Sequence, residues 1–461
     1  MKSSCNPDLS KYKFGDKRLL KRFGVIVDAF EAHPSSSIPQ ACGSSASTKA
    51  AYRFFSSSNV STQEIDNGTY QTTLERTAGF PTILVAQDTT SFNYSQHKKT
   101  SGLGPIDPKK TQGALMHSAY AVSPDGLPLG PLDRRLWTRD GKEFGKRKKR
   151  RTKKTDEKES QRWIDCEAAI EARISNTSSV VMISDREGDF YDHLARDRRP
   201  GVDIIIRAAQ NRRIEDETVH TLFEKLEESN PRGTYQVITR EVRSGKTRHA
   251  MVTYRYTHVV LRPPADRLIT HMHPIGIWAI MVREENPPEG VPGLHWKLFT
   301  TLKITSDEDA LQCINWYSHR WIIERFHYVL KSGCLVEELQ LEEAERINKA
   351  IALYTVVASR ILYMTYLARM NPEQGADAVL TTSEWEALCC RKQKTRTPPK
   401  SPPTLRDAIL MIAELGGFMG RKRDGMPGVK VIWRGLRRLS DISETYELFT
   451  STLNKKDVGN A

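Results

Sequence analysis

Two short apolar segments, each followed at once by an aspartate, constrain the fold of this chain more than any other feature. Residues 82–87 (TILVAQ) precede Asp88, and residues 180–184 (VVMIS) precede Asp185. Such nearly continuous apolar runs predict central strands that are buried on both faces of a sheet. Side chains at strand ends are held rigidly and open to a crevice at the edge of the sheet. We therefore predict an α/β fold with Asp88 and Asp185 at a site where these strands end.

A pair of carboxylates at such a place predicts a cation site. Two carboxylates held close together repel each other unless a cation neutralises them, and hard oxygen ligands select Mg²⁺. Asp88 and Asp185 are candidates for this role. The alternative for either residue alone is that it caps a turn, as many strand-end acids do.

The rest of the chain predicts a protein of several parts. Its 461 residues suggest two to four domains, and its 38% apolar and 27% charged residues indicate a globular chain. Strands are expected near 114–122 and 129–137, a helix at 155–174, a β-rich insertion over about 214–301, and helices at about 307–333 and 342–370. The apolar stretch 350–368 contains Arg360, which favours a buried core helix over a membrane span.

Positive charge is distributed in a way that suits a polyanionic partner. The formal net charge is +14, and a summed positive field attracts phosphates. Arg18 and Arg22 lie on a helix expected at 16–30, which could dock on a duplex or simply be solvated. Residues 146–154 are basic at eight of nine positions and predict a mobile loop that either contacts DNA or stays in solvent.

A third group of residues falls on the helix expected at 307–333. Tyr317, Arg320, Glu324 and Lys331 are spaced by three, four and seven residues, which predicts that they share one helical face. An acid flanked by a phenol, a guanidinium and an ammonium can hold a metal while gripping phosphates. The alternative is an exposed helix with ordinary ion pairing.

The same spacing is a family signature, and by it the chain resembles the insertion-sequence-four group of bacterial DDE transposases, most of all the Tn-five-like members. Further matching segments run in the same order along the chain, and their order makes the match specific. They are Phe14-Gly15-Asp16, Ala51-Tyr52-Arg53-Phe54, Asn59-Val60-Ser61, Asp88-Thr89-Thr90-Ser91, Asp156-Glu157-Lys158-Glu159-Ser160, Asp185-Arg186-Glu187, Asn286-Pro287-Pro288 and Leu415-Gly416-Gly417-Phe418-Met419.

The resemblance implies a fold and a division into domains. It implies a ribonuclease-H-like catalytic core at 71–372 with the β-rich insertion at about 214–301. It also implies an N-terminal helical domain at 1–70 that binds the transposon ends and a C-terminal helical dimerisation domain at 373–461. The residues that read bases at the transposon end do not carry over, because each element has its own end sequence.

The resemblance also assigns roles to residues. The catalytic, metal-binding acids would be Asp88, Asp185 and Glu324, with Asp88 bridging two Mg²⁺ ions, for which Mn²⁺ would substitute. Other residues would contact DNA: Tyr317, Arg320, Lys331 and Arg207 at phosphates, and Trp296 at a flipped-out base. Arg18 and Arg22 remain candidate DNA contacts through the basic helix expected at 16–30, not through the resemblance.

The reaction implied is cut-and-paste transposition. Hydrolysis would free a 3′-hydroxyl that forms a hairpin on the opposite strand, a second water would open the hairpin, and the hydroxyl would then attack target DNA. The partners would be double-stranded DNA, at the ends and the target, and a second copy of the chain on paired ends, with no membrane. Seven scattered cysteines without a C-x-x-C pair favour a reducing compartment, so we expect a cytoplasmic, nucleoid-associated bacterial protein.

Two other functions stay open at this point. One is a nuclease on the same fold that cuts DNA without joining it to a target. The other is a descendant that binds DNA but has lost catalysis.

Overall fold

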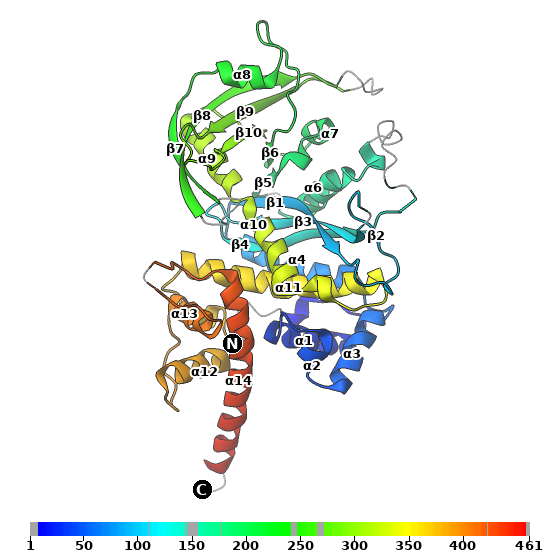
Figure 1. The fold of residues 1–461 in the computed structure, drawn as a ribbon, viewed down its shortest axis with the longest axis vertical. Helices are drawn as coiled ribbons and strands as arrows, with labels where there is room; N and C mark the ends of the chain where they lie inside the picture. Colours follow the sequence, from blue (N-terminus) through cyan, green and yellow to red (C-terminus); the bar gives the residue numbers. More distant parts are fainter. Residues whose placement is uncertain are drawn as a thin grey trace.

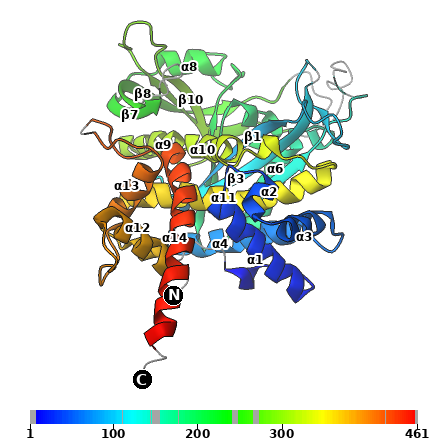
Figure 2. The ribbon, with the colours of Figure 1, turned by 60° about the horizontal axis from the view of Figure 1, so that its bottom comes forward.

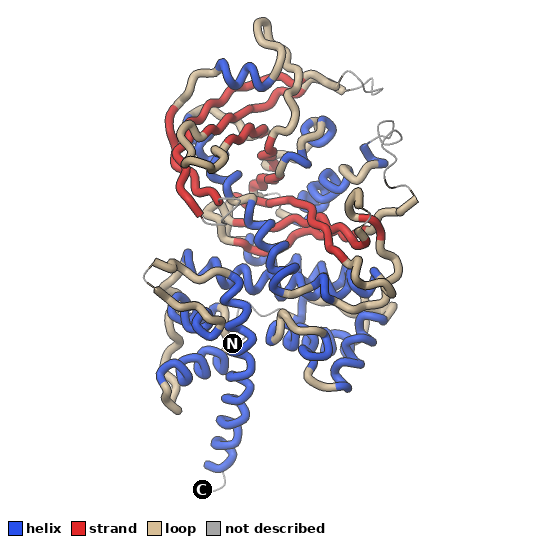
Figure 3. Tube along the Cα trace, viewed as in Figure 1, coloured by secondary structure: helices blue, strands red, loops and turns tan. Residues whose placement is uncertain are grey.

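The computed structural model describes residues 8–457 apart from 110, 143, 145–154, 176, 241–246, 265–271 and 422. The basic block at 146–154, expected to be a loop, therefore lies outside the described residues. Strands occupy the middle of the sequence and helices both ends (Figure 3). The chain is thus a mixed α/β protein with helical termini, as predicted.

One mixed sheet forms the centre of the molecule (Figure 1). Its order is β2-β3-β1-β5-β6-β10-β9-β8-β7, and β4 pairs with β3. The strands are β1 (Thr82–Asn93), β2 (Gly104–Pro105), β3 (Gln112–Val122), β4 (Pro128–Trp137), β5 (Ser179–Ser184), β6 (Val202–Arg207), β7 (Gly233–Arg240), β8 (Thr247–Leu261), β9 (Ile275–Arg283) and β10 (His295–Thr300). β5 and β6 run parallel to β1, whereas β3 and β4, which match the strands expected near 114–122 and 129–137, are antiparallel neighbours.

The strands of the expected β-rich insertion continue this sheet. β10 pairs antiparallel with β6, and β9, β8 and β7 follow outward from it. The insertion is therefore continuous with the core through backbone hydrogen bonds, and it ends immediately before the helices that carry Tyr317 and Glu324.

Helices pack against the sheet and form both ends of the chain. The described α-helices are α1 (Lys17–Ala32), α2 (Ile38–Cys42), α3 (Ser45–Ser56), α4 (Thr62–Thr77), α6 (Gln161–Arg173), α7 (Tyr191–Leu194), α8 (Leu222–Glu228), α9 (Asp307–Ser318), α10 (Trp321–Tyr328), α11 (Ala344–Met370), α12 (Thr382–Gln393), α13 (Leu405–Leu415) and α14 (Val429–Asp457). Short 3₁₀ turns are η1 (Leu9–Lys11), η2 (Thr155–Glu157), η3 (Arg186–Gly188), η5 (Val336–Glu338) and η6 (Ala376–Ala378), and η4 (Val329–Gly333) is a π-helical turn.

α11 is the central helix of the protein. It lies with α4 beneath the sheet, between the strands and the terminal helices α1–α3 and α12–α14 (Figures 1 and 2). α11 is apolar enough to pass a length and composition test for a membrane span, but 94% of that apolar window is buried inside the protein. It is therefore a core helix, as predicted, and not a membrane span.

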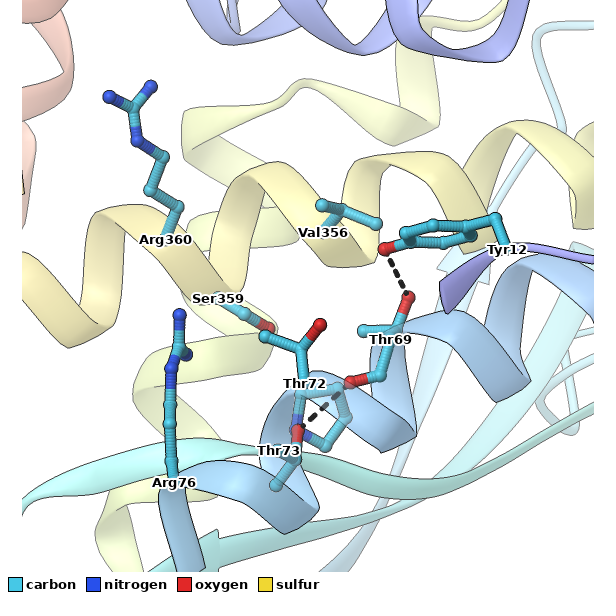
Figure 4. Close-up of a pocket in the computed structure, with 9 residues that line it drawn as sticks. Tyr12, Thr69, Thr72, Thr73, Arg76, Val356, Ser359 and Arg360 are labelled. Carbon is cyan, nitrogen blue, oxygen red and sulfur yellow. Dashed lines mark hydrogen bonds between the residues drawn. The ribbon is translucent and has the colours of Figure 1, made fainter. Parts of the chain in front are cut away.

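The N-terminal segment is attached to this layer by polar contacts. The Tyr12 hydroxyl lies 3.4 Å from the Thr69 hydroxyl on α4, beside a small pocket of about 20 Å³, which has room for about one water (Figure 4). Arg360, at the edge of the same cavity, donates to the Glu31 carboxylate of α1 at 2.9 Å. Burial, only partly offset by Arg360, raises the pKa of Glu31 to about 7. The N-terminal helices are therefore packed on the helix that leads into the C-terminal region.

Two local predictions are wrong. The first apolar strand does not end at residue 87, because β1 continues to Asn93 and keeps its antiparallel pairing with β3. The helix predicted over 307–333 is broken into α9, α10 and η4. At the break, the N–H groups of His319 and Arg320 bond to carbonyls three residues earlier, and this pattern tightens the helix.

Candidate functional site

The sheet register brings Asp88 and Asp185 together. The parallel pairing of β1 with β5 ends at Gln87 and Ser184, so Asp88 and Asp185 are the next residue of each strand. Asp88 is inside β1, opposite Ser118 of β3, whereas Asp185 begins the turn after β5. The two acids therefore meet where β5 ends. The prediction that Asp88 ends its own strand is wrong, because β1 continues past it.

Asp88 is supported by a histidine that the sequence reasoning missed. The Nδ1 atom of His327 on α10 lies 3.7 Å from the Asp88 carboxylate, and its Nε2 atom lies 3.3 Å from the Ser118 hydroxyl. His327 follows Glu324 by three residues, so one helix carries both side chains toward the same edge of the sheet. A buried polar residue at that spacing was the signal that could have identified it.

Asp185 is supported by its own turn. Its Oδ1 atom accepts the N–H of Glu187 at 2.8 Å, and this bond caps η3. Burial raises the pKa of Asp185; that N–H bond opposes the shift, and the negative charges of Asp88 and Glu324 add to it. The three acids are therefore close enough to interact electrostatically.

The turn after Asp185 is clamped from below by a buried ion pair. Asp189 accepts the N–H groups of Ala209 at 2.6 Å and Gln210 at 3.0 Å, and it pairs with Arg212. The Asp189 side chain is fully buried and that of Arg212 is 7% exposed. These residues were also missed by the sequence reasoning, and they fix the position at which the chain leaves β5.

Glu324 is held differently from the two aspartates. It lies in the first turn of α10, its side chain is 53% exposed, and its carboxylate accepts from Arg320 at 2.6 Å. Arg320 precedes α10 with helical backbone angles and shares a face with Glu324 at a spacing of four residues. The ion pair therefore sets the direction of the Glu324 side chain.

The donor atoms fit a divalent cation, but they are not gathered into a complete ligand set. In the described part of the chain, no three His, Cys, Asp or Glu side chains converge closely enough to hold a metal ion as they stand. Three carboxylates supply the hard oxygen atoms that Mg²⁺ and Mn²⁺ prefer. Glu324 is half-exposed and held by one ion pair, so its carboxylate is less constrained than those of the two aspartates.

Cations and aromatic rings surround the acids on the side of β6 and β10. Tyr317 is 3% exposed, and its hydroxyl has no hydrogen bond of normal geometry. Burial raises its pKa, and the nearby Arg320 and Arg207 oppose that shift. The Trp296 ring packs edge-to-face on the Tyr317 ring, with centroids 5.0 Å apart. The predicted residues Tyr317, Arg320, Arg207 and Trp296 are thus brought together.

Arg207 and Lys331 complete the cationic surroundings. Arg207 donates to the backbone carbonyl of His295 at 3.0 Å, and burial lowers its pKa. Lys331 lies on η4 with its Nζ 5.7 Å from the centre of the Phe92 ring. Burial lowers the pKa of Lys331, while the charges of Glu337 and Asp88 oppose that shift. Lys331 therefore faces β1. The prediction that it shares one continuous helix with Tyr317 is wrong, because α9, α10 and η4 are separate elements.

Arg18 and Arg22 are not part of this cluster. Both lie on α1, and Figure 1 shows α1 on the other side of α11 from the sheet. The Arg18 side chain is 92% exposed and pairs with Asp16 at 3.0 Å, the residue that caps α1. If these arginines contact DNA, the contact is separate from the acids.

Comparison with known protein families gives three matches in chain order. Residues 2–60 match the transposase DNA-binding family, residues 133–359 match the transposase DDE domain, and residues 356–452 match the transposase Tn5 dimerisation domain. The DDE match contains Asp185 and Glu324 and begins after Asp88. Together the three matches cover most of the chain, and their order is the order of parts predicted from the sequence.

Proposed function

The chain belongs to the Tn5-like DDE transposases, and we propose that it moves its own element by a cut-and-paste reaction. DNA binding, metal-dependent DNA cleavage and homodimer formation follow from the family. Our proposal is more specific: the dimer binds two inverted ends, cleaves them by hydrolysis and hairpin formation, and joins the 3′ ends to target DNA. The observation that supports it is that Asp88 and Asp185 follow paired positions of β1 and β5, with Glu324 close enough to influence the charge of Asp185 and with Tyr317 and Arg320 nearby.

The proposal includes a fold and domain limits. The strand order β4-β3-β1-β5-β6, with three antiparallel strands followed by two parallel ones, supports a ribonuclease-H-like core. We place an end-binding domain at 1–70, the catalytic domain at 71–372 with its insertion at about 214–301, and a dimerisation domain at 373–461. A cytoplasmic, nucleoid-associated location suits an enzyme that acts on DNA.

Asp88, Asp185 and Glu324 would hold the cofactor. Two bound Mg²⁺ ions, or Mn²⁺ in their place, would supply a water of lowered pKa and charge stabilisation at the departing 3′ oxygen. The chain's own contribution is to fix the two aspartates through the sheet and to deliver Glu324 from α10. Arg320 would have a double role, because it pairs with Glu324 and would also contact a DNA phosphate.

The residues around the acids would position the DNA. Tyr317, Arg320, Lys331 and Arg207 would hold phosphates of the strand that is not transferred. The face of Trp296 would receive a base expelled when the hairpin bends the end sharply, since stacking offsets part of the unstacking free energy. The same acids would thus serve four steps with different nucleophiles.

A strand-transfer assay tests this proposal. The full-length protein is given Mg²⁺, a target plasmid and a pre-cut end with a free 3′-hydroxyl, taken from the inverted repeats that bracket the reading frame. We expect covalent joining of the end to the target. Cleavage of uncut ends without joining would instead indicate a nuclease. Binding without any metal-dependent cleavage would indicate a non-catalytic descendant.

A further inference from the structure

A surface hollow that is lined by neither Trp296 nor the three acids has no role in the reaction described above. It has a volume of about 410 Å³ and lies between α10, η4 and the beginning of α14. Tyr328 and Trp433 lie against each other there with ring centroids 5.8 Å apart, and Lys430 and Arg434 line its edge. In Figures 1 and 2, the N-terminal end of α14 reaches the α10 region.

The two cations of this hollow are electrostatically uncompensated. Lys430 and Arg434 are exposed, and neither has an ion-pair or hydrogen-bond partner among the residues that the structure describes. Both lie in the first turns of α14, a helix of 29 residues with no acidic residue in its first turn. Cations at a helix N-terminus are repelled by the positive end of the helix dipole. A bound anion at this place would therefore be favoured by the side chains and by the helix.

The floor of the hollow is suited to a large polyanion. Trp433 is only 4% exposed and supports Tyr328, which is 37% exposed. Lys430 and Arg434 are four residues apart, on one face of α14. Two cations above a rigid aromatic floor match the repeating phosphates of a nucleic acid backbone better than a single small anion.

The position of the hollow indicates which DNA it would hold. Tyr328 follows Glu324 by four residues on α10, so the catalytic acid and the hollow share one side of that helix. Tyr317, Arg207 and Trp296 lie toward β6 and β10, where we have placed the transposon end. A second duplex must approach the same acids from a side that the end leaves free.

We propose that Lys430 and Arg434 form a phosphate-binding surface for the second DNA duplex, the target, on the α14 side of Glu324. This inference rests on the proposed strand-transfer function for the identity of the duplex. The contact would be to the backbone, so it would not depend on the target sequence.

Two double variants with the same loss of charge test this proposal. The test variant is Lys430→Ala with Arg434→Ala. The control is Arg391→Ala with Arg396→Ala, in and just after α12, where both arginines are exposed and have no partner in the described part of the chain. Equal unfolding temperatures of the two variants and the wild type would establish that folding is unchanged.

The first readout is binding of a 40-base-pair duplex of arbitrary sequence, followed by fluorescence anisotropy over a range of salt. We expect the test variant to flatten the log–log salt slope by about 1.8, that is two contacts at about 0.9 each, with no change for the control. A slope equal to that of the control would overturn the proposal. A shift in oligomeric state without a change in slope would also overturn it and would assign the hollow to subunit contact.

The second readout separates this proposal from the proposed function. Binding of a pre-cut end that stops at the scissile phosphate should be the same for the test variant and the control. Selective loss of that binding would assign the hollow to the transposon end and overturn our choice of duplex. If the wild type binds both duplexes but joins neither, the proposed function fails while the slope still decides whether the surface binds DNA.

Discussion

Asp88 lies within the hydrogen-bonded sheet and Asp185 directly follows its last paired residue on β5, whereas Glu324 is attached to a short helix that follows a break. The aspartates are adjacent because β1 and β5 pair in one register, which ends at Gln87 and Ser184. Glu324 depends on the tightened turn at residues 319–323 and on one ion pair with Arg320. The comparison indicates that the strands provide a fixed half of the site and α10 an adjustable half.

A rigid half and an adjustable half would suit the proposed reaction, in which one site handles several nucleophiles. A fixed pair of carboxylates keeps its position in each step, while a half-exposed acid can follow changes in the DNA. The π-helical turn η4 continues α10 and carries Lys331. Such turns often occur at functional sites. The adjustable half therefore includes a residue that we expect to grip a phosphate.

The largest expected effect comes from removing the acids altogether. Asp88→Ala, Asp185→Ala and Glu324→Ala should each lower Mg²⁺-dependent nicking by at least about a thousandfold, because each would remove an oxygen ligand from the proposed metal site. End binding, measured by gel shift, should persist in all three. A variant that keeps Mg²⁺-dependent nicking would show that its residue is not a ligand, and the two halves would then not form one site.

The sheet half of the site was easier to predict from the sequence than the helical half. The apolar runs before Asp88 and Asp185 identified β1 and β5, because burial on both faces of a sheet leaves a clear pattern. The continuation of β1 to Asn93 could not be predicted, because the polar segment 88–91 stays extended through its pairing with β3. The tertiary partner overrode the local pattern.

The helical half was harder to predict. The spacing of Tyr317, Arg320 and Glu324 predicted one helical face. The break between α9 and α10 is made by backbone hydrogen bonds, and no residue type in the segment predicts it. His327 and Asp189 were missed because their partners, Asp88 and Arg212, are distant in sequence or lie in a loop. Contacts of that kind are determined by the fold and not by local periodicity.

Changing the length of an acid side chain should have a larger effect in the fixed half of the site than in the adjustable half. Asp185→Glu should lower the nicking rate by about a hundredfold. The added methylene displaces the carboxylate by about 1 Å, and the fixed backbone cannot move to compensate. Glu324→Asp should cost only about tenfold, because its half-exposed side chain and the α10 turn can readjust. Single-turnover nicking at saturating Mg²⁺ is the measurement. Equal losses for the two variants would contradict the assignment of a fixed and an adjustable half.

The clamp beneath Asp185 should contribute to stability as well as to position. Asp189→Asn leaves the buried Arg212 with a weaker partner and should lower the free energy of unfolding by about 3 kcal/mol, as expected for a broken buried ion pair. Asp307→Asn is the matched control. Asp307 pairs with Arg232 on the surface, where their side chains are 41% and 51% exposed, respectively. That change should cost less than about 1 kcal/mol. If urea unfolding gives similar losses of unfolding free energy for the two variants, the buried Asp189–Arg212 pair contributes no more to stability than an exposed pair.

The smallest expected effect concerns Trp296, which touches the adjustable half through Tyr317. The ring is partly buried and packs on the core, so it could serve only to fill the insertion. If it instead receives an expelled base, Trp296→Ala should leave the first nick nearly unchanged and slow hairpin formation or opening by about tenfold, since stacking on an aromatic ring contributes about 1–3 kcal/mol per base. Trp296→Phe should keep most of the rate, and an abasic site at the expelled position should partly restore the alanine variant. A variant that loses the first nick and hairpin formation equally, with a lowered unfolding temperature, would show that Trp296 supports Tyr317 and the packing of β10, and the base-receiving role would be wrong.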